Sequence, residues 1–64
     1  MSDIEFIKKF SKITVRSACK QAGVNEHNFW GERVKQEKVK EIKNIIILAV
    51  IKLIEDELKN ESTS

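Results

Sequence analysis

The fold is decided by the stretch Thr14-Val-Arg-Ser-Ala-Cys-Lys-Gln-Ala-Gly-Val-Asn25. Thr14 is placed to cap a helix over residues 15–22, because its side-chain oxygen can accept a hydrogen bond from an amide of the first turn. Gly23 should end that helix, since glycine adopts positive φ at no steric cost. Asn25 is then the cap of the next helix. Two short helices joined by a tight glycine-containing turn are typical of a helix-turn-helix.

A further helix is expected upstream of this turn. Ser2-Asp-Ile-Glu5 has the pattern of a capping box, in which the serine hydroxyl and the glutamate carboxylate each satisfy a free amide of the new helix. Apolar residues then recur at positions 4, 7 and 10 and form one apolar face. We therefore expect a first helix of about three turns whose lysines face solvent.

A long helix is expected downstream, over residues 36–58. Gly31 has low helix propensity and lies shortly before this long helix, so we expect a kink or break within residues 31–37. One apolar line of the long helix, which should cover the front of the domain, consists of Val39, Ile42, Ile46 and Leu53. A second line has the heptad-like spacing of a coiled coil and consists of Ile47, Ile51, Ile54 and Leu58. Because the small domain cannot cover both lines, the second is predicted to form the interface of a homodimer.

Length and composition limit the class of protein. The chain has 64 residues, two glycines, one cysteine, one histidine and no proline. This predicts one all-α domain of three or four helices over residues 1–59, followed by a disordered polar tail over residues 60–64. A domain of this size buries only about 60% of the surface that its unfolded chain exposes. One cysteine and one histidine supply neither an internal disulfide nor a zinc site, so we expect no metal or cofactor, and association of chains remains as the stabilising device.

Charge is distributed unevenly along the chain. Residues 1–43 contain ten basic and six acidic side chains, a net charge of +4, whereas residues 44–64 contain two basic and four acidic ones, a net charge of −2. A basic front half favours binding to a polyanion such as nucleic acid. The N-terminus is acidic where a signal peptide would be positive, and the apolar run at residues 45–51 is too short to span a membrane. We therefore expect a cytoplasmic protein with no membrane partner.

Residues 13–30 resemble the helix-turn-helix of tetracycline-repressor-type and related homeodomain-like regulators. The matching positions are Thr14, Val15, Arg16, Ala22, Gly23, Val24, Asn25, Phe29 and Trp30. The resemblance implies that Thr14 and Trp30 contact DNA phosphates and that His27 and Asn28 face the major groove. The first helix is shorter than in that family and a ligand-binding domain is absent, so no inducer pocket is implied.

The chemistry of these side chains fits DNA. Asn28 can pair with adenine through two hydrogen bonds, and His27 can donate to a base or a phosphate. Basic side chains on the flanks can neutralise phosphates. The nominated DNA-binding residues are Thr14, Arg16, Asn25, His27, Asn28, Trp30, Arg33 and Lys35. Simpler interpretations are that Trp30 belongs to the core and that His27 is merely exposed.

We expect a small dimeric, sequence-specific DNA-binding protein, a transcriptional regulator of the repressor type, with the brevity typical of phage, plasmid or mobile-element proteins. Two-fold symmetry predicts a palindromic site with half-sites about 34 Å apart, or a multiple of that distance. Two other functions stay open. One is a helical inhibitor that binds a protein partner through Glu26, Trp30 and Glu32. The other is a DNA-organising or replication protein that binds DNA without sequence preference. An enzyme is not expected, because the sequence contains no clustered carboxylates, nucleophile–base pair or phosphate-cradling loop, and no small-molecule substrate is evident.

Overall fold

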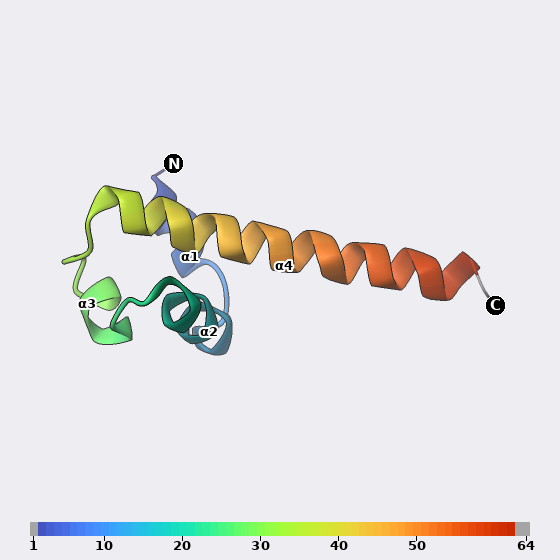
Figure 1. Ribbon diagram of the computed structural model, residues 1–64, viewed down its shortest axis with the longest axis horizontal. Helices are drawn as coiled ribbons and strands as arrows, with labels where there is room; N and C mark the ends of the chain where they lie inside the picture. Colours follow the sequence, from blue (N-terminus) through green and yellow to red (C-terminus); the bar gives the residue numbers. More distant parts are fainter. Residues whose placement is uncertain (1, 63–64) are drawn as a thin grey trace.

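The computed structural model describes residues 2–62, with side chains through residue 60, and contains four helices and no strand in that range. The helices are α1 (Asp3–Lys8), α2 (Lys12–Ala22), α3 (Glu26–Trp30) and α4 (Gln36–Ser62). Figure 1 shows that α1, α2 and α3 gather along the first half of α4, while the second half extends alone. The all-α prediction with a long C-terminal helix is therefore confirmed.

The start of α1 follows the predicted capping box. The Ser2 side chain accepts a hydrogen bond from the Glu5 amide at 3.2 Å, and the Ser2 amide donates to the Glu5 carboxylate at 3.4 Å. The start of α2 differs from the prediction. Ser11, not Thr14, is the cap, because Ser11 has extended backbone and its hydroxyl accepts from the Thr14 amide at 3.2 Å. The helix therefore begins at Lys12, and Thr14 lies inside its first turn.

The turn between α2 and α3 has the predicted geometry. Gly23 ends α2 in the left-handed region, with φ of 72°, and its amide bonds back to the carbonyls of the last turn of α2. Asn25 caps α3 by accepting from the His27 amide at 2.9 Å. The break expected within residues 31–37 falls between the end of α3 at Trp30 and the start of α4 at Gln36.

One apolar core joins all four helices. Its buried members are Ile7, Val15, Ala18, Cys19, Ala22, Phe29, Val39, Ile42 and Ile46. Burial raises the pKa of the Cys19 thiol, with the charge of Glu26 as a second cause, so this cysteine stays protonated and acts as a small apolar side chain. A charged contact also ties the first helix to the last, because Lys43 pairs with Asp3 at 2.9 Å and lies over the Phe6 ring.

The second half of α4 leaves this core. We call residues 2–50 the body and residues 51–62 of α4 the arm. Every described side chain of the arm is exposed, and Leu53, which was expected to cover the body, is 70% exposed. It lies in line with Ile46, but α1 and α2 do not extend far enough along α4 to bury it. The helix also continues through residues 60–62, where a disordered tail was expected, and residues 63–64 lie outside the described part of the chain.

Candidate nucleic-acid interface

The short helix α3 presents its polar side outward. Phe29 is fully buried and anchors the helix to the core, and Val34 in the following loop is half-buried against the same core. His27 and Asn28, which the resemblance placed in a DNA groove, are both exposed. Phe29 thus holds the helix against the core, and the exposed His27 and Asn28 form a small polar surface around the first turn of α3.

Glu26 connects this surface to α2. Its carboxylate accepts one hydrogen bond from Arg16 Nε at 3.1 Å and another from Trp30 Nε1 at 3.2 Å. The Trp30 hydrogen bond and, after it, the contact with Arg16 lower the pKa of the Glu26 carboxyl below its ordinary value. Trp30 is half-buried and packs edge-on against Phe29, so it is part of the core and also holds Glu26. The negative charge of Glu26 is thus offset within the molecule.

A row of basic side chains runs along α2 beside this cluster. Lys12, Arg16 and Lys20 recur at every fourth residue and are all exposed. Residues four apart lie on one side of an α-helix, so the three charges form a single stripe. Sequence reasoning nominated only Arg16, although the four-residue spacing was a visible signal for the other two.

The loop over residues 31–35 extends the basic surface on the other side of α3. Arg33 and Lys35 are exposed, and the Arg33 guanidinium lies so close over Gly31 that an added Cβ atom would come within 2.8 Å of it. Glu32, the second acidic residue of this region, pairs with Lys8 of α1 at 3.7 Å. The two acidic side chains that border the surface, Glu26 and Glu32, are therefore each paired with a basic one.

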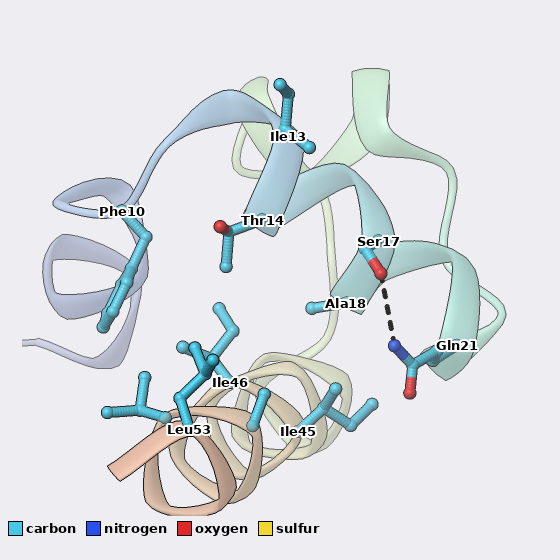
Figure 2. Close-up of a pocket in the computed structure, with 11 residues that line it drawn as sticks. Phe10, Ile13, Thr14, Ser17, Ala18, Gln21, Ile45, Ile46 and Leu53 are labelled. Atoms are coloured by element: carbon cyan, nitrogen blue, oxygen red, sulfur yellow. Dashed lines mark hydrogen bonds between the residues drawn. The ribbon is translucent and has the colours of Figure 1, made fainter. Parts of the chain in front are cut away.

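Thr14 lies apart from the other nominated residues. Residues two apart in a helix are rotated by about 200°, so Thr14 and Arg16 occupy opposite sides of α2. Thr14 is half-buried, its hydroxyl lies 2.9 Å from the Ser11 hydroxyl, and Figure 2 shows it pointing toward α4. The structure thus brings together most of the nominated DNA-binding residues but places Thr14 on another surface.

That other surface is an apolar groove between α2 and α4, with a volume of about 400 Å³. It is lined by Phe10, Ile13, Thr14, Ser17, Ala18, Gln21, Ile45, Ile46, Ala49, Val50 and Leu53 (Figure 2). Its polar rim is internally bonded, because Gln21 donates to the Ser17 hydroxyl at 3.3 Å. No local sequence pattern indicates this groove, whose lining runs along α2 from Ile13 to Gln21 and along α4 from Ile45 to Leu53.

The nominated dimer residues lie on a third surface. Ile47 is half-buried, whereas Ile51, Ile54 and Leu58 are 45%, 55% and 60% exposed. We call these four residues the seam. Apolar side chains at this spacing form one stripe along α4, and within a single copy of the chain the arm part of the stripe faces solvent.

Other kinds of site find little support in the part of the chain that the structure describes. Within residues 2–62, no group of three or more His, Cys, Asp or Glu side chains is placed to hold a metal ion. No described helix combines the length and apolarity that a membrane span requires. No protein-family model, curated protein or solved structure matches the chain.

Proposed function

We propose that the protein is a small homodimeric DNA-binding regulator of the repressor type. In this proposal the body contacts a DNA duplex through α3, the stripe on α2 and the loop over residues 31–35. The arm holds two copies together through the seam. The observation that carries the proposal is the exposure of His27 and Asn28 between two sets of exposed basic side chains, with both neighbouring carboxylates paired internally.

The exposed side chains of α3 have the chemistry to distinguish bases. An asparagine amide pairs with adenine through two hydrogen bonds, and such a pair contributes about 1–3 kcal/mol of discrimination in the major groove. We assign this role to Asn28, with His27 beside it as a donor to a base or phosphate. Asn25 keeps a different role, because its side chain is already used to cap α3. It supports the DNA surface without contacting DNA.

Basic side chains on both flanks would supply most of the affinity. Lys12, Lys20 and Lys35 make no ion pair among the described residues, so their charges are available to phosphates. Arg33 is also exposed, whereas Arg16 is shared with Glu26. Phosphate contacts of this kind position a protein on the duplex and carry little sequence information. The flanking basic side chains therefore supply most of the affinity, and α3 supplies the selectivity.

The dimer is proposed because the isolated chain leaves large apolar side chains in water. Ile51, Ile54 and Leu58 lie on one stripe of a helix that protrudes from the body, and full burial of such a side chain contributes about 1.5–3 kcal/mol. A second copy would cover the stripe and add a second set of DNA contacts. It would also compensate for the small core of a body formed by about 50 residues.

A second candidate function is binding to a protein. The apolar groove between α2 and α4, about 400 Å³ in volume, is the observation that favours it. The surface expected for this function from the sequence, around Glu26 and Glu32, is less suited, because both carboxylates are already paired. Binding in an apolar groove would depend only weakly on salt, which separates this function from DNA binding.

The test is the binding of labelled random-sequence duplex DNA at several salt concentrations. For a DNA-binding protein the logarithm of the affinity falls linearly with the logarithm of salt, with a slope of about −0.9 per phosphate neutralised. Lys35→Gln should weaken binding and reduce the slope by about one such unit per copy of the chain, or about two per dimer. Lys52→Gln makes the same charge change on the arm and serves as the matched control, with the slope unchanged. No binding at micromolar protein, or equal effects of the two variants, would contradict the proposal.

A further inference from the structure

The spacing of the seam is unchanged when the chain direction is reversed. Ile47, Ile51, Ile54 and Leu58 are separated by four, three and four residues, so the stripe reads the same from either end. If a second α4 lies against the first in the opposite direction, Ile47 meets Leu58 of the other copy and Ile51 meets Ile54. Every apolar side chain of the seam then has an apolar partner, without any change of register.

The distribution of charge favours this antiparallel arrangement over the parallel one. The body is basic, and the exposed lysine Lys40 lies next along the seam line on the body side. The arm carries three consecutive exposed acidic residues at positions 55–57. A parallel pair would place body beside body, arm beside arm and Lys40 opposite its own copy, which is unfavourable for like charges. An antiparallel pair places each acidic arm beside the basic body of the other copy.

We infer that the occupant of the seam is a second copy of this chain, packed antiparallel, with Ile47 of each copy against Leu58 of the other. This inference rests on the homodimer of the proposed function but does not depend on DNA binding. In this arrangement the two-fold axis passes between residues 52 and 53, and the arm of each copy covers the partly exposed Ile47 of its partner. The apolar groove between α2 and α4 is not needed for the contact.

The antiparallel pair has a consequence for the spacing of DNA sites. Gln36, at the start of α4, lies about 16 residues from the axis, which is about 25 Å along a helix that rises about 1.5 Å per residue. Because α3 lies at that end of α4 (Figure 1), the two α3 helices are at least about 50 Å apart. This exceeds the roughly 34 Å of one helical turn of DNA. The half-sites are therefore expected to be two or more turns apart, with a separation of about 68 Å or a larger multiple of one turn.

Cross-linking between single cysteines tests the orientation. The background is Cys19→Ala, which removes the buried native thiol at small cost in volume. Ile47→Cys and Leu58→Cys are prepared separately in this background, and one portion of each is treated alone with a short bismaleimide. Untreated portions of the two variants are mixed, unfolded and refolded together, and only then treated with the same reagent. In the antiparallel pair the two copies of either single cysteine are about 16 Å apart along the helix axis, too far for the reagent. A covalent dimer with one copy of each variant should form only in the mixture. Leu48→Cys, exposed on another side of α4, is the control and should cross-link in neither case.

Each outcome decides the inference. Cross-linking of Ile47→Cys alone and of Leu58→Cys alone indicates a parallel pair and overturns the orientation, while the homodimer stands. No cross-link in any sample overturns the antiparallel packing of the seam, and monomeric sedimentation of the unmodified chain overturns the homodimer as well. Loss of DNA binding in the salt series would leave the cross-linking pattern unaffected, so the two proposals can fail separately. Circular dichroism of each variant checks that α4 is still formed.

Discussion

The two halves of α4 both carry large apolar side chains, but the surroundings of those side chains differ. Within the body, Val39, Ile42 and Ile46 are at most 1% exposed, whereas in the arm Leu53 and Leu58 are at least 60% exposed. The difference arises from the neighbours, because α1 and α2 pack only along the first half of the helix (Figure 1). An apolar stripe thus shows which side of a helix is favoured for burial. It does not show whether the same chain provides that cover.

The largest difference between body and arm should appear in stability. Phe29→Ala removes a fully buried ring from the body and should cost about 3–5 kcal/mol, comparable to the whole stability of so small a domain. Leu53→Ala on the arm should change stability by less than about 0.5 kcal/mol, because its side chain already faces water. Urea unfolding followed by circular dichroism measures both. Similar costs for the two substitutions would mean that Leu53, which lies outside the seam, is buried in solution and that its exposure is wrong.

The next effect concerns association and belongs to the arm. Ile51→Asp places a charge in the middle of the seam and should weaken the dimer at least about thirtyfold, as substitution at the centre of an interface commonly does. Leu48→Asp puts the same charge on an exposed position outside the seam and is the matched control. Sedimentation equilibrium gives the dimer dissociation constant for each. Equal constants for the two variants would remove the seam as the interface.

A smaller effect is expected at the turn that orients α3 on the body. Gly23 has φ of 72° with open space around it, so Gly23→Ala should cost about 1–2 kcal/mol from backbone strain alone. Gly31→Ala has no such strain, and its new methyl group would only displace the flexible end of Arg33. Thermal unfolding should therefore separate the two variants. If Gly23→Ala were as stable as the wild type, the left-handed conformation at this turn would be wrong.

The smallest effect is a dependence of stability on pH. The pKa of Glu26 is lowered in the folded chain, so its contacts with Trp30 and Arg16 stabilise the fold above the ordinary carboxyl pKa. That contribution is lost as the pH falls through the lowered value. Glu26→Gln should lose this part of the acid dependence, measured as the difference in unfolding midpoint between neutral and acidic buffer. An unchanged acid dependence in Glu26→Gln would show that the ionisation of Glu26 contributes nothing to stability.

Local signals in the sequence predicted much of the fold. The capping box at Ser2, the glycine at position 23 and the cap at Asn25 each act within a few residues, and all three are confirmed. The cap of α2 was misplaced because Ser11 and Thr14 are both suitable residues, and the choice depends on which of them has extended backbone. Local chemistry alone did not decide between them.

Features that depend on packing were harder to predict. The contact of Glu26 with Arg16 joins residues ten apart across the turn, so it follows from how α3 packs on α2. The exposure of Leu53 follows from where α1 and α2 end along α4. The position of Thr14 in the groove, away from the candidate DNA surface, follows from the same packing. Spacing along one helix contains no information about these distances.

The most direct test of sequence-specific binding by the body is a selection from a pool of duplexes with a long random region. The wild-type protein is predicted to enrich an inverted repeat, with half-sites separated by a whole number of helical turns. The double variant His27→Ala with Asn28→Ala should retain salt-dependent binding but lose the enriched sequence, because the phosphate contacts remain and the base contacts do not. Enrichment of the same repeat by both proteins, or no enrichment by the wild type, would contradict the role of α3 in recognising DNA sequence.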